Sequence, residues 1–307
     1  MAASSAARKS QSVTTALRRL GQFLWRRQNR GVTVAALAVA VFCGIGLVGP
    51  FLTPDNPDDE VYQALLGSSW AHPFGTDEVG RDLFSRVVFG MRISAEIAIV
   101  TVLVAGVVGT VAGLYTGYYG GLRDSVTMRV ADFLLGFPPL VLALLLAAII
   151  GPSTLTVLVA TIALSIPLFA RMVRASTLAE RQKEYVLAAR ALGASDWSVM
   201  LRTLLPSVLG VALVEGAIVA ALAIQVEAAL SFLGVGVPPP TPSLGSLLYD
   251  SLTYISRAPL YGVFPGVGLV LLVGSFMALA KALQVRWSLN PVSALPAASR
   301  EVAEAEK

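Results

Sequence analysis

Long apolar runs constrain the fold of this chain more than any other feature of its sequence. Six runs approach the length of about 20 residues that a helix needs to cross a bilayer. These runs are residues 32–52, 93–114, 130–150, 155–172, 208–233 and 263–282. Hydrophobic residues make up 55% of the chain and charged residues only 14%, which is far from the composition of a soluble domain. The sequence therefore predicts an all-α membrane protein with six transmembrane helices.

Prolines interrupt the third and fourth of these runs. Pro138 and Pro139 lie within the third, Pro167 lies within the fourth, and only residues 151–154 separate the two runs. Proline is tolerated inside a span where neighbouring helices or water compensate for the missing backbone hydrogen bond. We expect two spans here, with a re-entrant hairpin as the alternative.

The distribution of charge predicts how the chain is oriented. Residues 1–30 hold seven basic and no acidic side chains, whereas residues 54–91 hold seven acidic side chains against two arginines. Basic residues flanking a span stay in the cytoplasm. We therefore expect a basic cytoplasmic tail over 1–30, a first span over 31–53 and an external segment over 54–91. A transmembrane core over 92–284 and a second cytoplasmic tail over 285–307 complete the chain.

Residues that carry chemistry are scarce. Cys43, the only cysteine, lies in the first span, where packing is its expected role. His72, the only histidine, has no second His or Cys near it in the sequence, so we expect no metal site. The chain holds no phosphate-binding loop and no hydrolase motif, so we expect no catalytic residue and no cofactor. The net charge of +4 fits a tail that attracts anionic lipids and requires no nucleic acid.

A polar, basic stretch separates the fourth and fifth runs. Residues 184–206 read EYVLAARALGASDWSVMLRTLLP. Helix formers precede Gly193, which suits a helix C-terminus, and Ser195 can cap a following helix. The pattern predicts two short helices joined by a turn, on the same side of the membrane as the basic tail. Small residues such as Ala188 and Ala189 would let another protein approach this helix closely. The simpler alternative is a solvated loop with no partner.

This stretch resembles the coupling loop of permease subunits of ATP-binding-cassette (ABC) importers. Their pattern is Glu-Ala-Ala, three residues, Gly, nine residues, Ile, any residue, Leu-Pro. The matching positions here are Ala188, Ala189, Gly193, Leu205 and Pro206, whereas Leu187 stands in place of Glu and Thr203 in place of Ile. The resemblance implies that the loop over 173–206 contacts an ATPase subunit. The expected coupling residues are Glu184, Tyr185, Leu187, Ala188, Ala189, Arg190, Leu192, Gly193, Ala194, Trp197, Leu205 and Pro206.

Other stretches resemble the dipeptide, oligopeptide and nickel branch of these permeases. HPFGTDEVGRDLFSRVVFGMRIS at 72–94 and EAALSFLGVGVPPPTPSLGSLL at 227–248 carry the resemblance, with shorter matches at 117–124 and 137–144. The chain departs from the branch after residue 276, where such permeases commonly have Gly-Asp-x-Leu-Arg-Asp. The resemblance implies a type I ABC importer permease fold, with an extra N-terminal span before a five-helix core.

The resemblance also implies a function and a set of partners. The chain would be the non-enzymatic permease subunit of an importer in the cell membrane, forming half of a path for peptides. Nickel or another small ligand is the alternative cargo. The implied partners are a homologous second permease subunit, two ATPase subunits that bind ATP and Mg, and an extracytoplasmic substrate-binding protein. Competing classes are an intramembrane hydrolase, which needs a nucleophile and base within the spans, and an ATPase-independent channel or secondary transporter, which predicts repeated spans.

The external segment carries four candidate docking residues, Asp77, Glu78, Arg81 and Asp82. We expect them to form local ion pairs, followed by an amphipathic helix whose apolar residues lie on the membrane surface. These apolar residues are Leu83, Phe84, Val87 and Val88. The segment would either contact the binding protein or pack the first span against the rest of the chain.

Carboxylates inside spans are the remaining candidates. Each costs about 2.5–3.5 kcal/mol near the bilayer centre, so it should face protein or water rather than lipid. Glu96 follows Arg92 by one helical turn, which predicts a local pair. Glu215 and Glu227 share the fifth span about 120° apart, so both cannot line one narrow path. Each is expected either to line the translocation path or to form a structural hydrogen bond. Glycines in the second span should allow close helix packing.

Overall fold

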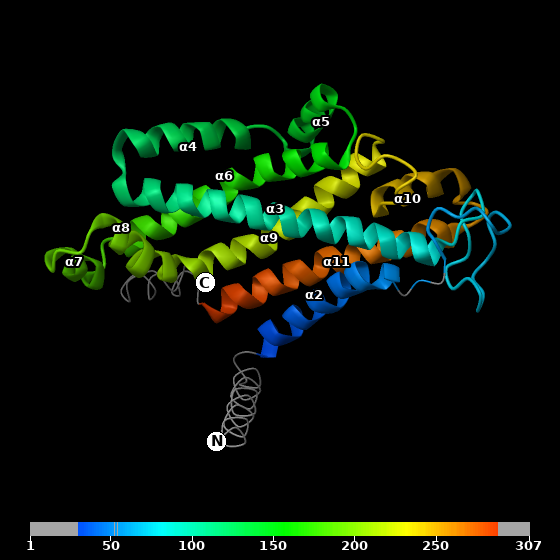
Figure 1. The fold of residues 1–307 in the computed structure, drawn as a ribbon, viewed down its shortest axis with the longest axis horizontal. Helices are drawn as coiled ribbons and strands as arrows, with labels where there is room; N and C mark the ends of the chain where they lie inside the picture. Colours follow the sequence, from blue (N-terminus) through cyan, green and yellow to red (C-terminus); the bar gives the residue numbers. More distant parts are fainter. Residues whose placement is uncertain (1–29, 52, 54, 288–307) are drawn as a thin grey trace, which may run out of the picture.

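The computed structural model describes residues 30–51, 53 and 55–287, and its regular elements there are helices. They are α2 (Arg30–Val48), η1 (Gly49–Phe51), α3 (Leu83–Tyr119), α4 (Gly121–Leu135), α5 (Pro139–Ile150), α6 (Thr154–Glu180), α7 (Glu184–Ala191), α8 (Asp196–Ser198), η2 (Val199–Leu204), α9 (Leu205–Phe232), α10 (Leu244–Ser251), η3 (Leu252–Tyr254) and α11 (Pro259–Arg286). Five helical stretches in these residues are long and apolar enough to span a membrane, or six if the bent pair α4 and α5 counts as one span. The long helices run roughly along one axis of the molecule (Figure 1).

Glycines let α3 and α6 pack closely. A Cβ atom added to Gly109 would lie 2.8 Å from the backbone oxygen of Ile166, and one added to Gly113 would lie 2.5 Å from that of Ala170. Only a hydrogen fits at such a distance, so these glycines bring the two backbones together. The expectation of close packing by the Gly-rich second span is confirmed.

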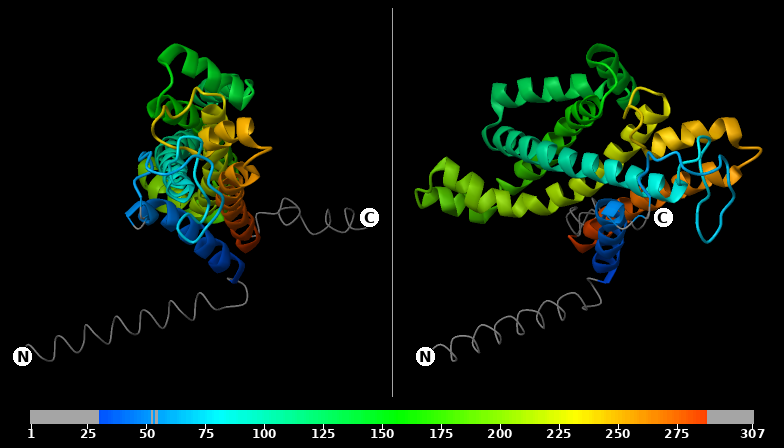
Figure 2. Two further views of the ribbon diagram at one scale, coloured as in Figure 1. Left: turned by 90° about the vertical axis from the view of Figure 1, so that its right-hand side faces the viewer. Right: turned by 45° about the vertical axis from the view of Figure 1, so that its right-hand side comes forward.

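The third predicted span is bent at the place where Pro138 and Pro139 interrupt it. Helices α4 and α5 meet at an angle of 87° across a short break. Pro138 and Pro139 cannot continue α4, because proline lacks a backbone N–H and disfavours helical conformation in the residue before it. Figure 2 shows α4 and α5 on the opposite side of the bundle from α2. The fourth run forms one helix, α6, so the re-entrant alternative does not hold for it.

Charges of α4 are paired with arginines of α6. Arg174 forms an ion pair with Asp124, with its Nη2 2.6 Å from Oδ2, and Arg171 forms one with Asp132. Both arginines lie inside α6, which extends to Glu180, beyond the predicted start of the loop at 173.

The helix that was expected on the membrane surface is the first part of α3. Leu83 begins α3, which continues without a break to Tyr119. Leu83 and Val87 are 1% and 3% exposed and pack against Leu244 and Tyr261. A stripe of apolar residues fits a protein neighbour as well as a membrane surface, and here the neighbours are α10 and α11. The packing interpretation is therefore correct for this stretch.

The two polar segments lie at opposite ends of the bundle. Helices α7 and α8 extend beyond one end of the long helices, and the segment before α3 lies with α10 at the other end (Figure 1). This agrees with one cytoplasmic and one external segment. The predicted tails fall almost entirely on residues 1–29 and 288–307, outside the described residues.

Candidate functional site

The segment between α6 and α9 forms the predicted turn between two helices. Helix α7 ends at Ala191, and Gly193 takes a φ of +83°, which favours glycine. The Ser195 side chain then accepts a hydrogen bond from the Ser198 backbone N–H at 3.3 Å and caps α8. The second helix is not separate as predicted, because α8, η2 and α9 form one helical stretch from Asp196 to Phe232.

A buried valine anchors α7 to the membrane helices. Val186 is fully buried, although its neighbours Tyr185 and Leu187 are exposed. Val186 belongs to an apolar cluster formed with residues of α3, α6, η2 and α9. The other buried members are Leu114, Tyr118, Val173, Val199, Met200, Leu204 and Val208. The burial of this one residue therefore fixes α7 against the bundle, while most of its other residues stay exposed.

Polar contacts reinforce this anchor at the end of α3. The Arg190 guanidinium lies 4.6 Å from the centre of the Tyr118 ring, and the Tyr118 hydroxyl donates a hydrogen bond to Asp196. Arg181 donates to the backbone oxygens of Gly117 and Tyr118 at 2.9 and 3.0 Å. Both ends of the segment therefore contact the last turn of α3, which should hold its position firmly.

The outer face of the segment carries large apolar side chains. Leu192 is 88% exposed, Trp197 67% and Leu187 52%. Ala188, Arg190 and Pro206 are also exposed, whereas Ala189, Ala194 and Leu205 are half-buried. Large exposed aromatic and aliphatic side chains are common where proteins contact one another. The predicted coupling residues thus share one exposed segment, with Val186 as the buried contact that sequence reasoning missed.

A small ion-pair network fixes the start of α7. Lys183 Nζ lies 2.6 Å from Glu180 Oε1, and this hydrogen bond raises the pKa of Lys183. The Tyr185 hydroxyl donates to the other oxygen of Glu180, and burial followed by this bond raises the pKa of Tyr185. Both side chains therefore keep their neutral-pH protonation states, and Glu184 remains exposed at the first turn.

A π-helical turn joins the segment to the fifth span. Residues Val199–Leu204 form this turn, and the Leu205 backbone N–H bonds to the Met200 oxygen five residues back. Such turns are rare and often occur at functional sites. Pro206, which has no N–H, follows directly. The sequence analysis did not predict the π turn. Pro206 was the one local indication, because a residue without a backbone N–H interrupts the regular helical hydrogen bonds.

The two carboxylates of α9 differ in their partners. Glu227 is fully buried and accepts hydrogen bonds from Ser94 of α3 at 2.7 Å and from Ser231 at 3.0 Å. It forms the structural hydrogen bond to a neighbouring helix that was one of the two expectations. Glu215 is 5% exposed, and no hydrogen bond to it is formed within the described residues. The expected Arg92–Glu96 pair is confirmed, with Nε and Oε1 2.7 Å apart.

The four candidate docking residues bond within their own chain. Asp77 is fully buried and accepts hydrogen bonds from the backbone N–H groups of Val79 and Arg81 and from Arg81 Nε at 2.9–3.0 Å. Asp82, 1% exposed, caps α3 by accepting from the Ser85 N–H at 2.8 Å. Glu78 accepts from the Tyr261 hydroxyl. The predicted local ion pairs are present, and these contacts support the packing interpretation for the four side chains.

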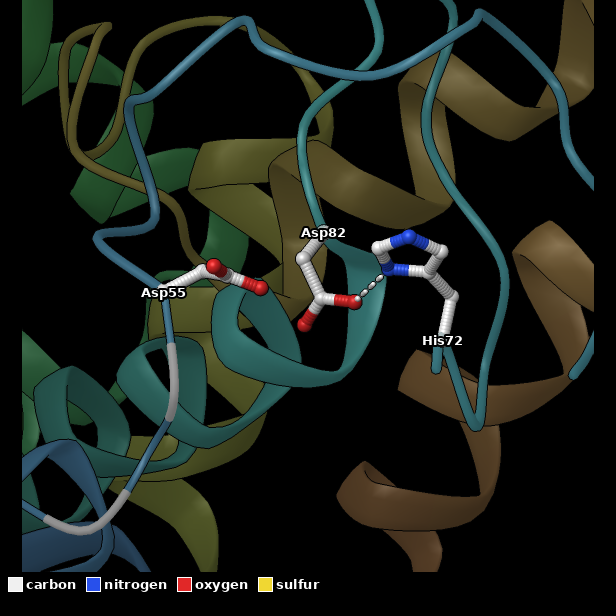
Figure 3. Close-up of side chains that lie close together, drawn as sticks. All are labelled: Asp55, His72 and Asp82. Carbon is white, nitrogen blue, oxygen red and sulfur yellow. Dashed lines mark hydrogen bonds and ion pairs between the residues drawn. The ribbon is translucent and has the colours of Figure 1, made fainter. Parts of the chain in front are cut away.

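His72 has acidic neighbours that the sequence did not reveal. Its Nδ1 lies 3.1 Å from Asp82 Oδ1, and Asp55 points toward the same place (Figure 3). The expectation of no metal site rested on the lack of a second His or Cys nearby, and it stays a prediction. The fold brings in carboxylates 17 residues before and 10 residues after His72.

A comparison with protein families matches residues 109–288 to one described as "Binding-protein-dependent transport system inner membrane component". The match covers more than half of the chain. It includes the whole segment from α6 to α9 and excludes α2 and the external segment.

Three related chains cover most of this one. The glutathione transport system permease protein GsiD of Pectobacterium atrosepticum is 39% identical, with 87% of this chain and 89% of the relative covered. The dipeptide transport system permease proteins DppC of Alkalihalophilus pseudofirmus and Haemophilus influenzae are 35% and 32% identical. The alignments cover 86% of this chain in both cases, and 87% and 92% of the relatives.

A solved structure shares the fold. A chain of the MetNI methionine ABC transporter, in an inward-facing conformation, aligns with a TM-score of 0.53 at 20% identity. The alignment covers 67% of this chain and 96% of that chain. The five-helix core with an additional N-terminal span agrees with this partial coverage. The chain belongs to the family of binding-protein-dependent transport system inner membrane components, and it is a multi-pass permease subunit of an ABC importer.

Proposed function

We propose that this permease forms one half of a path that imports short peptides, and that separate ATPase subunits drive it through the segment from α7 to α8. The names of the relatives support a peptide cargo, since they refer to glutathione and dipeptide transport. No feature of the described residues favours nickel over a peptide.

The exposed apolar face around Leu192 and Trp197 is the observation that carries this proposal. The segment that carries it lies at the end of the bundle opposite the external segment (Figure 1). We infer that water rather than lipid surrounds this end, because the segment is polar and basic. Exposed aromatic and aliphatic side chains in water are favourable only when a partner covers them. A cleft on an ATPase subunit would bury this face, with Arg190 and Glu184 at its polar rim.

The anchoring of α7 provides the mechanical link. Val186 joins α7 to α3, α6 and α9 through one apolar cluster, and Arg181 joins the preceding turn to α3. A displacement of α7 by the ATPases would therefore move three membrane helices together. Close-packed interfaces change between discrete arrangements, so such a displacement can switch the side to which the path opens. ATP and Mg would bind to the ATPase subunits alone.

The remaining partners follow from the charge asymmetry and from the family description. We place the α7 end, and both termini, in the cytoplasm, because residues 1–30 are strongly basic. A substrate-binding protein would then dock at the other end, on exposed residues such as Trp70, which is 104% exposed, rather than on the buried Asp77 and Asp82. A homologous permease subunit would complete the path, and Glu215 is our candidate for a group that lines it.

Purification of the complex from native membranes tests the proposal. The permease should carry a tag and be extracted with a mild detergent or a polymer, and mass spectrometry should identify the proteins and small molecules that copurify. We expect two ATPase subunits, a second permease and a binding protein that carries short peptides. Bound nickel in place of peptide would contradict the cargo. Recovery without an ATPase, under conditions that keep other membrane complexes intact, would contradict the coupling.

A further inference from the structure

We propose that Asp55, His72 and Asp82 form a binding site for a divalent transition-metal ion, which fastens the external segment to the start of α3. One ligand atom from each side chain lies within 4.8 Å of the other two (Figure 3). Metal–ligand bonds of about 2.0–2.2 Å place coordinating atoms about 3–4 Å apart. A contraction of about 1 Å at the widest edge would therefore complete the coordination.

The charge around the site favours a cation. The external segment has two arginines, and both contact other acids. Arg81 Nε lies 2.9 Å from Asp77, and Arg86 lies 3.3 Å from Asp77 and 3.8 Å from Asp58. Within the described residues, neither Asp55 nor Asp82 has an ion pair with a lysine or an arginine. Among the described residues that form ion pairs with these two carboxylates, His72 is thus the only group that can carry positive charge.

A hydrogen bond between His72 and Asp82 explains the position of these two side chains but not the carboxylate of Asp55 beside them. A neutral imidazole that donates from Nδ1 would satisfy Asp82 but would leave the charge of Asp55 beside it uncompensated. Asp82 is 1% exposed and Asp55 is half-buried, so water screens this repulsion less than it would at the surface. A bound divalent ion would balance both carboxylates and would accept the Nδ1 lone pair.

The ligands are held in place by bonds to their other atoms. The Tyr62 hydroxyl donates to Asp55 Oδ1 at 2.9 Å, and the Ser85 backbone N–H donates to Asp82 Oδ2 at 2.8 Å. The Tyr62 ring packs edge-on against His72 with the ring centres 4.1 Å apart. Such outer contacts orient ligands and keep metal sites rigid. Tyr62 thus touches two of the three ligands.

The loop that carries these residues is itself ordered by close backbone contacts. A Cβ atom at Gly80 would lie 2.0 Å from the backbone oxygen of Tyr62, and Gly80 has a φ of +85°. The Thr76 hydroxyl donates a hydrogen bond to the backbone oxygen of Gln63 at 2.7 Å and accepts one from the backbone N–H of Leu66 at 2.8 Å. The cluster joins three places in the chain: the start of the external segment, its middle and the N-cap of α3. A metal ion there would connect all three.

The ligand types select the class of metal. One imidazole nitrogen and two carboxylates suit Zn²⁺, Mn²⁺, Fe²⁺ or Ni²⁺, with water in the open positions. Mg²⁺ and Ca²⁺ prefer oxygen ligands alone. We use Zn²⁺ as the probe, since it has no redox chemistry.

Metal titration of the purified permease tests the site without any transport assay. The full chain, carrying a tag free of histidine, is placed in nanodiscs, treated with a chelator and titrated with ZnCl₂ by calorimetry. We expect one Zn²⁺ per chain at micromolar concentration, and a thermal unfolding midpoint that rises with Zn²⁺. His72→Gln and Asp55→Asn should each weaken binding at least tenfold, whereas the exposed Asp59→Asn should not change it.

Three results would overturn the proposal. They are the absence of stoichiometric Zn²⁺ binding by the wild-type chain, binding that survives unchanged in both ligand variants, and equal binding of Mg²⁺ or Ca²⁺. Asp55 is only half-buried, so its variant should fold even if the His72 variant does not. Tyr62→Phe adds a graded test, because loss of its hydroxyl should weaken Zn²⁺ binding less than loss of a ligand does.

Discussion

The external segment, as we name the residues before α3, and the segment from α7 to α8 lie at opposite ends of the bundle and differ in what they bury (Figure 1). Both connect membrane helices and both are rich in charge. The external segment buries some of its charges, since Asp77, Asp82 and Arg86 are at most 4% exposed. The segment from α7 to α8 exposes apolar side chains such as Leu192 and Trp197. The first segment is thus held by its own buried ion pairs, whereas we propose that the second presents its exposed side chains to another chain.

The largest expected effect on stability is at Asp77. Asp77→Ala would remove the acceptor of two backbone N–H groups and would leave Arg81 and Arg86 without their nearest carboxylate. Breaking a buried ion pair from one side costs about 3–5 kcal/mol. The thermal unfolding midpoint of the purified chain should fall strongly.

The exposed acid Asp59 is the matched control for this change. Asp59→Ala removes a carboxylate of the same segment at a surface position, where the effect should stay within about 0.5 kcal/mol. If both variants unfolded at the same temperature, the external network would not be what stabilises the segment.

The second prediction concerns transport rather than stability. Gly193 has a φ of +83° and open space around its Cα, so a side chain meets no clash but strains the backbone. Gly193→Val should strain this turn by about 1–3 kcal/mol and shift α7 relative to α8. We expect dipeptide uptake by cells with the assembled transporter to fall at least tenfold, while the amount of permease in the membrane stays the same.

Gly193→Asn is the control that distinguishes the effect of backbone strain from the effect of adding any side chain. Asn tolerates the left-handed region, so Gly193→Asn should retain most of the uptake. Equal uptake in the valine variant and the wild type would refute a role for this turn in coupling.

The sequence predicted the turn at Gly193 because that signal is local. Helix formers, a glycine and a capping serine follow one another within a few residues. The break between α4 and α5 was also signalled, by Pro138 and Pro139. The angle of 87° between the two helices was not signalled locally. The ion pairs of α4 with Arg171 and Arg174, which hold it beside α6, were not apparent in the local pattern.

Features that depend on distant contacts could not be predicted in this way. The apolar stripe at Leu83 and Val87 fits a membrane surface and a protein core equally well, and only the positions of α10 and α11 decide between them. Val186 is one apolar residue among several in α7, and its burial depends on the ends of α3 and α6. The partners of His72 lie too far along the chain to be chosen without the fold.

The third prediction tests whether the exposed apolar face binds the ATPases. Leu192→Asp places a charge on a side chain that is 88% exposed, so the permease alone should keep its stability. Burying an unpaired charge in the interface would weaken binding. Recovery of ATPase subunits with the purified permease should therefore fall several-fold.

Val61 provides a control from the other end of the molecule. It is 71% exposed in the external segment, and Val61→Asp should leave ATPase recovery unchanged. Equal recovery with the Leu192 variant and with the wild type would place the ATPase contact elsewhere.

The smallest expected effect on stability is at Asp250, and it tests whether nearby arginines fully balance the acidic side chains of the external segment and α10. Asp250 lies on α10, and burial first, then the charge of Glu78, raises its pKa. Asp77 acts in the same direction, whereas Arg86 and Arg81 oppose it. An acid whose pKa is raised by folding favours the folded state most when it is protonated. Its contribution to stability is thus fully present below the unfolded pKa of about 3.9 and is lost as the pH rises through the raised value.

Asp250→Asn should therefore stabilise the chain slightly at neutral pH, by less than about 1 kcal/mol, and should flatten the pH dependence of its unfolding midpoint. The measurement is thermal unfolding of both proteins in nanodiscs between about pH 4 and pH 8, upward from the unfolded reference pKa. A variant that is less stable than the wild type at neutral pH would show that Asp250 accepts a favourable contact there. The external end would then be as fully compensated around α10 as it is around Asp77, where two arginines and two backbone N–H groups surround a single carboxylate.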